Sequence, residues 1–341
     1  MKIKINEARK HLPLILMAKL VPMIHGSPAV GKSAIVLDVA EEYNLKVIDL
    51  RLSQCDPTDL MGFPNIDRNH HRPKAGYVPM ETFPIEGDEI PDGYSGWLLF
   101  LDEFNSASPA VQSAAYKVVL DRMVGQHKLH KNVAIVAAGN LETDGAIVQP
   151  LSTALQSRLV HLEVEVCPRA WCDWANDKGL DPRITSYIEF RPDNLYTFSP
   201  DHSDKTYASP RTWEFTNRLI TQAGQVSREL LPVLAGTIGE GVAREFIEFC
   251  RIQDSLPKIQ DIISAPDTYR VPDEPSVLHA LIGAIATNAN NHNLNALMTY
   301  VKRLPIEMQV VCLRNLVRRN KPLIQHAAII DWISHTAVEL F

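Results

Sequence analysis

The strongest constraint on this chain is an eight-residue segment near its amino terminus. Residues 26–33 read GSPAVGKS and match the pattern GxxxxGK[ST]. The apolar run Val21–His25 before the segment predicts a strand, and the pattern over Lys32–Tyr43 predicts a helix. In that order, backbone amides and the positive end of the helix dipole point at one anion. We therefore predict a phosphate-binding loop made of Gly26, Ser27, Pro28, Ala29, Val30, Gly31, Lys32 and Ser33.

The last two residues of this loop carry the chemistry that a nucleoside triphosphate requires. Lys32 can place its ammonium group against the β and γ phosphates, and the Ser33 hydroxyl can coordinate Mg²⁺, which prefers oxygen ligands. We therefore expect ATP and Mg²⁺ as cofactors. The alternative is a glycine loop of accidental sequence, which the flanking strand and helix disfavour.

A second signal is an apolar run that ends in two acids. Residues Trp97–Leu101 predict a strand buried on both faces, and Asp102 and Glu103 follow it directly. Asp102 is placed to act on the Mg²⁺ ion of a nucleotide site, and Glu103 is placed to polarise the attacking water. The alternative is that the two acids cap the next helix, which begins near Pro109.

A third signal is the strand-like run Val133–Ala138, which ends in Gly139 and Asn140. At the carboxyl edge of a parallel sheet, an Asn side chain can hold the γ phosphate or the attacking water. A Gly-Asn pair taken alone is more typical of a plain turn. Its position in the chain, after the two earlier motifs, is what favours a site.

Strand-like and helix-like runs alternate along the first half of the chain and predict a parallel sheet flanked by helices. After about Cys167 the patterns become helical. We expect two domains, an α/β nucleotide-binding core over residues 1–166 and an α-helical lid with further helices over 167–341. Within the core, the Pro- and Gly-rich stretch 56–94 predicts a long irregular excursion with one short helix, and 124–132 predicts a hairpin, with a simple solvated turn as the alternative.

Composition and charge narrow the functional classes. The 34 Lys and Arg against 40 Asp and Glu give a net charge of −6, so the chain lacks the overall positive field that attracts nucleic acid. Its five cysteines form no CxxC pair, which disfavours a zinc ribbon. No apolar run approaches the roughly 20 residues that cross a bilayer, and we expect a cytoplasmic protein without a membrane span. A basic helix face is predicted to be solvent-exposed; it comprises Arg314, Arg318, Arg319 and Lys321.

In chain order, the phosphate-binding loop, the LLFLDE run, the AAGN run and two later segments resemble the AAA+ ATPases, specifically their MoxR and dynein-related branch. The later segments are LQSR, residues 155–158, and SPR, residues 209–211. The resemblance covers residues of about 20 to 220. It implies a P-loop NTPase core followed by a helical lid.

The resemblance also implies roles for three residues. Asn140 would act as sensor 1, Arg158 as the arginine finger that reaches the γ phosphate of a neighbouring subunit, and Arg211 as the sensor 2 arginine of the lid. A finger that acts in trans requires a homo-oligomer, and a hexameric ring is expected. The alternative for Arg158 is a surface ion pair with an acid such as Glu163, and the alternative for Arg211 is a residue at the start of a helix that binds no ligand.

The function that the resemblance suggests is an ATP-driven chaperone that remodels a protein client, such as a protein with a von Willebrand A domain. Two alternatives stay open. One is an AAA+ motor acting on nucleic acid, which the acidic net charge disfavours. The other is a scaffold that ATP assembles with incidental turnover, which Glu103 disfavours because a pure switch needs no water-activating carboxylate.

Overall fold

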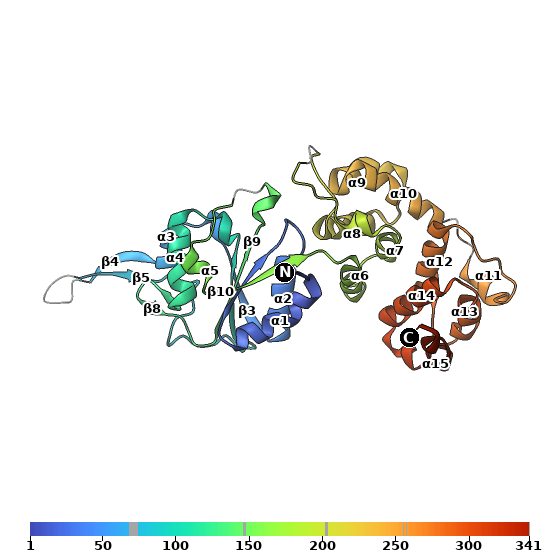
Figure 1. Cartoon of the computed structure of the whole chain (residues 1–341), viewed down its shortest axis with the longest axis horizontal. Coiled ribbons are helices and arrows are strands. Elements are labelled where there is room, and N and C mark those ends of the chain that lie inside the picture. Colours follow the sequence, from blue (N-terminus) through green and yellow to red (C-terminus); the bar gives the residue numbers. More distant parts are fainter. Residues whose placement is uncertain (68–73, 146–147, 202–203, 255, 257, 341) are drawn as a thin grey trace. The chain divides into compact units, whose positions relative to one another are not determined.

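The chain is described by a computed structural model over residues 1–67, 74–145, 148–201, 204–254, 256 and 258–340. It divides into two compact units (Figure 1). The first unit comprises Met1–Cys167 with Ser199–Asp201, and the second comprises Pro168–Phe198 with His202–Phe341.

Within the described residues, the first unit is built on a six-stranded sheet in which all neighbouring strands are parallel. The order across the sheet is β1-β10-β2-β9-β6-β3. The strands are β1 Lys2–Lys4, β2 Val21–His25, β3 Leu45–Arg51, β6 Gly96–Asp102, β9 Val133–Gly139 and β10 Leu159–Glu165. The predicted α/β class is confirmed, and the predicted sequence runs match the central strands.

Helices cover both faces of this sheet because successive residues of its central strands are apolar on either side. In β6, Leu99 belongs to the core cluster that includes Val111 and Val118, whereas its neighbour Phe100 is directed to the opposite face, and all four side chains are buried. Figure 1 shows α4 on one face and α1 with α2 on the other. These helices are α1 Ile5–Met17, α2 Lys32–Glu42 and α4 Pro109–Leu120.

The stretch 56–94 is more regular than the sequence predicts. Antiparallel strands β4, Phe63–Asp67, and β5, Lys74–Val78, form a hairpin in it. The expectation of an irregular excursion is therefore wrong for these two strands. β4 is hard to predict because it contains Pro64, a residue that strands usually exclude, and because it pairs with β5 of the same hairpin. The predicted hairpin over 124–132 is confirmed. The remaining elements of the unit are α3 Pro57–Met61, α5 Thr153–Gln156, β7 Met123–Val124 and β8 His127–Lys128.

The regular secondary structure described in the second unit is all helical, as the sequence predicts after Cys167. None of the helices within the described ranges combines the length and the apolar character that a bilayer crossing needs. The helices are α6 Pro168–Asp177, α7 Pro182–Phe190, α8 Pro210–Ala223, α9 Leu231–Ile238, α10 Glu240–Asp254, α11 Ile259–Ser264, α12 Pro275–Asn288, α13 Leu294–Val301, α14 Ile306–Arg319 and α15 Ala327–Leu340.

The expectation of a solvated basic face is wrong for the three arginines of α14, which have partners on other helices, whereas Lys321, after the end of α14, is exposed as predicted. Arg314 Nη2 lies 2.6 Å from Glu189 Oε1 of α7, and the Glu189 side chain is only 9% exposed. Arg318 pairs with Asp173 of α6, and Arg319 donates to Thr185 Oγ1 at 3.2 Å. Acids carried by the earlier helices α6 and α7 thus pair with Arg314 and Arg318, whose side chains are 21% and 28% exposed.

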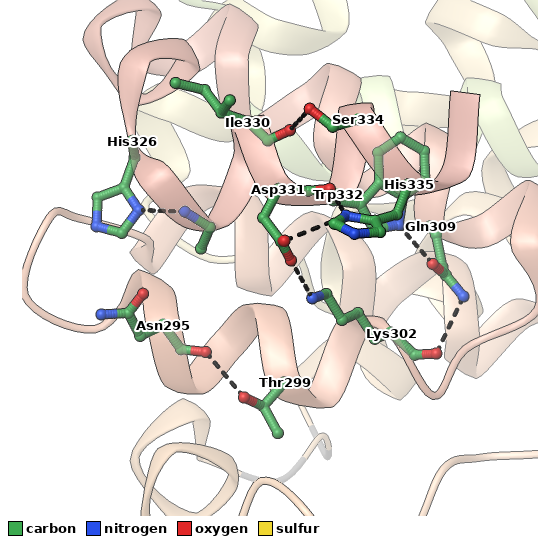
Figure 2. Close-up of polar contacts among 11 residues, drawn as sticks. Asn295, Thr299, Lys302, Gln309, His326, Ile330, Asp331, Trp332, Ser334 and His335 are labelled. Atoms are coloured by element: carbon green, nitrogen blue, oxygen red, sulfur yellow. Dashed lines mark hydrogen bonds and ion pairs between the residues drawn. The ribbon is translucent and has the colours of Figure 1, made fainter. Parts of the chain in front are cut away.

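The carboxyl-terminal helix is tied to the preceding helices by polar contacts beside an apolar core (Figure 2). The Trp332 indole, 7% exposed, donates to Gln309 Oε1 at 2.7 Å. The Lys302 ammonium lies 2.7 Å from Asp331 Oδ2. A buried aromatic ring with a satisfied N–H fixes the position of α15.

Candidate functional site

Four loops meet at one edge of the first unit's sheet, and three of them carry predicted site residues. Strands β2, β9, β6 and β3 are consecutive neighbours and parallel, so their carboxyl ends lie side by side. The residues that follow them are Gly26, Asn140, Glu103 and Leu52. Ligands of open α/β sheets bind at this edge.

The loop after β2 folds around the Lys32 ammonium group. Lys32 is 8% exposed, and its Nζ donates to the carbonyl oxygens of Gly26 at 2.6 Å and Ser27 at 3.0 Å. Gly31, the N-cap of α2, has φ +104°, a conformation that favours glycine. A Cβ on Gly26 would lie 2.7 Å from Val164 Cγ2. The two glycines therefore permit the tight loop that brings a buried cation to the start of a helix.

Asn140 is joined to this cation. Its Oδ1 accepts a hydrogen bond from Lys32 Nζ at 3.0 Å. Asn105 holds it in place, because Asn105 Nδ2 donates to Asn140 O at 2.8 Å and Asn140 N donates to Asn105 Oδ1 at 3.0 Å. A Cβ on Gly139 would lie 2.2 Å from Asn105 Oδ1. Gly139 therefore leaves room for the Asn105 side chain, and Asn105 holds Asn140 against Lys32. This arrangement is more specific than a plain turn, and no local sequence pattern predicts the part of Asn105 in it.

Ser33 and Asp102 come together as the sequence predicts. Ser33 Oγ donates to Asp102 Oδ2 at 3.2 Å, and the amide of Glu103 donates to Asp102 Oδ1 at 2.8 Å. Burial and then the negative charge of Asp102 raise the pKa of nearby Asp49. A hydroxyl and a carboxylate beside excess negative charge fit Mg²⁺, which takes few protein ligands and completes its shell with phosphate oxygens and water. Over the described ranges, His, Cys, Asp and Glu form no group of three or more that could hold a metal without such a ligand.

Glu103 lies next to Ser53, which follows β3. The Ser53 hydroxyl donates a hydrogen bond to Glu103 Oε2. Glu103 has φ +55°, in the left-handed region that few non-glycine residues adopt. The acids do not cap α4, because its N-cap is Ser108, whose Oγ accepts from the amide of Val111 at 3.4 Å. Ser53 was missed because a serine in a short turn after a strand has no distinctive pattern.

Asp144 touches the loop from another side. Its Oδ1 accepts a hydrogen bond from Ser27 Oγ at 3.1 Å. Its Oδ2 is buried and has no hydrogen-bond partner among the described residues. Asp144 lies in the turn that follows Asn140, and no local sequence pattern distinguishes it.

Of the two arginines that the resemblance indicated, Arg158 belongs to the first unit and Arg211 to the second. Arg158 is exposed, donates to Ala154 O at 2.9 Å and lies 5.8 Å from the Tyr116 ring centroid. It does not pair with Glu163, whose carboxylate is 3.7 Å from Lys2 Nζ. Arg211 is an exposed residue near the start of α8 in the second unit, so its relation to the loop stays a prediction.

A histidine pair lies directly before the loop. His25 Nε2 and His161 Nδ1 are 2.9 Å apart, and the two rings stack with centroids 5.1 Å apart. The other ring nitrogen of His161, Nε2, is 2.9 Å from Gln156 O, so it donates there and leaves Nδ1 to accept from His25. Burial, and then the charge of His161, lower the pKa of His25 to about 4. His25 is therefore neutral at pH 7.

Fold and site together define a P-loop α/β protein followed by a helical unit. No protein-family model and no curated protein matches the sequence. Among solved structures, it is similar to a mutant of RuvB from Thermotoga maritima, at 16% identity over 77% of this chain and 75% of that one, with a TM-score of 0.35. It is also similar to NtrX from Brucella abortus, at 13% identity over 93% of this chain and 67% of that one, with a TM-score of 0.37. Scores this low assign no family, so the functional assignment rests on the chain's own residues.

Proposed function

We propose that the chain is an ATPase of the AAA+ superfamily, in its MoxR-like branch, which hydrolyses MgATP. The observation that carries this proposal is the meeting of two pairs at one sheet edge, Lys32 with Asn140 and Ser33 with Asp102. A buried ammonium group, a helix N-terminus and an oxygen pair suited to Mg²⁺ are together what a triphosphate needs.

The residues have distinct parts in the proposed reaction. Lys32 would exchange its carbonyl and Asn140 partners for phosphate oxygens. Mg²⁺, when bound by Ser33 and Asp102, would supply charge neutralisation on the β and γ phosphates. Glu103 would orient and deprotonate the attacking water once it leaves Ser53, and Asn140 would hold that water or the γ phosphate.

The proposed assembly is a ring of identical chains, with six subunits the expected number. Arg158 supports the ring. Its guanidinium is exposed, contacts Ala154 O and the Tyr116 ring, and does not pair with Glu163, so it can reach a neighbouring copy of the chain. An arginine supplied in trans stabilises the charge of phosphoryl transfer. Arg211 would report the nucleotide state to the helical unit, and the work done would be remodelling of a protein client in the cytoplasm.

A nucleic-acid motor is the weaker candidate. The cluster of arginines on α14, which could have formed a basic face, is neutralised by Glu189 and Asp173. The formal net charge is −6. Both observations favour a protein client, since non-specific nucleic-acid binding depends on exposed Lys and Arg.

The test of ATPase activity is phosphate release from MgATP by the wild type, Lys32→Ala and Lys46→Ala. Lys46 is an exposed lysine on β3 and serves as the matched control. We expect Lys32→Ala to lower turnover by about 100-fold or more, since it removes a charged group that contacts the transferred phosphate. Equal rates for the wild type and Lys32→Ala would overturn the proposal.

The test of the ring is the particle mass by light scattering, with and without ATP, using Glu103→Gln so that nucleotide stays bound. A shift toward about six subunits in ATP would agree with a closed ring. A monomer under both conditions would contradict the ring and the role of Arg158 in trans.

A further inference from the structure

Asp144 is the feature of the site that the proposed reaction leaves unexplained. Its carboxylate reaches the phosphate-binding loop through Ser27 Oγ, 3.1 Å away. The second oxygen, Oδ2, is buried without a hydrogen-bond partner among the described residues. A buried carboxylate oxygen that accepts no hydrogen bond is costly and uncommon in folded proteins. The position of the Asp144 carboxylate beside the phosphate-binding loop therefore suggests a function in nucleotide binding.

Ser27 connects this carboxylate to the cation of the loop. The Ser27 carbonyl accepts from Lys32 Nζ at 3.0 Å, while the Ser27 hydroxyl donates to Asp144. One residue therefore contacts both the ammonium group that would bind the β and γ phosphates and a negatively charged group. Because one residue links the two groups, the charge of Asp144 would act on a phosphate bound by Lys32, and more strongly where screening by water is reduced.

We propose that Asp144 sets the nucleotide preference of this loop by opposing the γ phosphate, so that it favours a nucleoside diphosphate over a triphosphate. This inference rests on the proposed ATP site and deepens it. The additional phosphate of a triphosphate brings further negative charge toward Asp144, and like charges at short range in a partly buried site repel. ADP lacks that phosphate and leaves the Ser27–Asp144 hydrogen bond intact.

Such a preference has a consequence for turnover. If ADP is held and ATP is disfavoured, exchange of product for substrate limits the rate, as product release does in many enzymes. Asp144 is then a positioning residue, which acts through Ser27 and through its charge without touching the reacting atoms. Contacts from a subunit or client that draw Asp144 away from Ser27 would favour loading with ATP.

The experiment compares binding of MgADP and of Mg²⁺ with the non-hydrolysable analogue AMP-PNP by calorimetry on the full chain. The variants are Asp144→Asn, which keeps the shape and removes the charge, and Glu142→Gln as the control. Glu142 is an exposed acid in the same turn. We expect Asp144→Asn to tighten AMP-PNP by about tenfold, a size typical of one nearby like charge, with ADP affinity changed far less.

Several outcomes separate the possible roles. Equal weakening of both nucleotides in Asp144→Asn would mean that Asp144 is only a brace of the loop, and would overturn the inference. A wild type that binds neither nucleotide would overturn the proposed function itself. If Asp144→Asn does not fold, Asp144→Ser removes the same charge, and an unchanged ratio of AMP-PNP to ADP affinity in that variant would overturn the inference too.

Discussion

The Ser53 hydroxyl donates a hydrogen bond to Glu103 Oε2, and thereby joins the loop after β3 to the acid after β6. Glu103 is held there with a left-handed backbone, φ +55°. Backbone strain of this kind persists where surrounding contacts fix it, and it clusters at functional sites. The carboxylate that we propose as the base for the attacking water is thus held by a hydroxyl from the loop after β3.

Glu103→Gln should keep nucleotide binding and stop turnover. The amide has nearly the same shape but cannot act as a base, and loss of a general base lowers rates by about 10²- to 10⁴-fold. The measurement is phosphate release together with equilibrium binding of MgATP. Turnover at the wild-type rate would remove Glu103 from the mechanism, and Glu142→Gln, an exposed acid at the same edge of the core, is the matched control.

Ser53→Ala should raise the basal ATPase rate, because the Glu103 carboxylate is no longer held by a hydroxyl. We expect a change of about two- to fivefold, equivalent to about 0.5–1 kcal/mol for one hydrogen bond. The change should appear in kcat and leave KM nearly unaltered, since Ser53 contacts no predicted phosphate ligand. A fall in kcat would show that Ser53 instead holds Glu103 in its productive position; Ser113→Ala, on the surface of α4, is the control.

Much of the core could be predicted from sequence because its signals are local. The GSPAVGKS loop and the apolar runs of β6 and β9 specify their own conformation and meet at one edge through parallel pairing. By contrast, β10 was missed because His161 and Glu163 interrupt its apolar residues, and only pairing with β2 makes it a strand. Asn105 and Asp144 could not be predicted either, because each is recognised only by its hydrogen bond to a residue distant in sequence.

The basic residues of α14 show the limit of reading one helix alone. Their pattern predicts a solvated face, but Glu189 and Asp173 on earlier helices meet it. A charged helix face is consistent either with exposure to solvent or with pairing to acids. The pairing cannot be predicted from the helix alone, because the partners are distant in sequence. The same limit applies to Arg158 and Arg211, whose predicted partners are a neighbouring chain and a bound nucleotide.

Arg158→Ala should lower the ATPase rate of the assembly by about 10³-fold or more while nucleotide affinity of isolated subunits stays nearly unchanged, as expected of an arginine that acts in trans. Mixing Arg158→Ala with Glu103→Gln subunits should restore part of the activity, because some interfaces then combine an intact Arg158 with an intact Glu103. Mixtures that never regain activity would count against the assignment. Arg244→Ala is the control, because this exposed arginine pairs with Glu240 within its own helix, α10.

Glu189→Ala should destabilise the second unit by about 3 kcal/mol or more. It leaves Arg314, 21% exposed, without the carboxylate that lies 2.6 Å away, and an unpaired buried charge is costly. Lys321→Ala is the control, because its pair with Asp177 at 3.9 Å is exposed and should contribute little. Urea unfolding followed by circular dichroism measures both. Equal midpoints for the two variants would contradict a structural role for the buried pair.

Acid should destabilise the first unit through His25. Its pKa is about 4 in the folded chain and 6.5 for the ordinary group, because burial and the charge of His161 disfavour the protonated ring. Between those values the unfolded chain binds more protons, so stability falls as pH decreases from 6.5 toward 4. His25→Gln should be less stable than the wild type at pH 7 and should lose less on transfer to pH 5, whereas His335→Gln, at an exposed position on α15, should follow the wild type. The measurement is the urea midpoint of each protein at both pH values. If the midpoint of His25→Gln depends on pH as strongly as that of the wild type, the His25–His161 pair before the phosphate-binding loop is not the cause of the acid sensitivity.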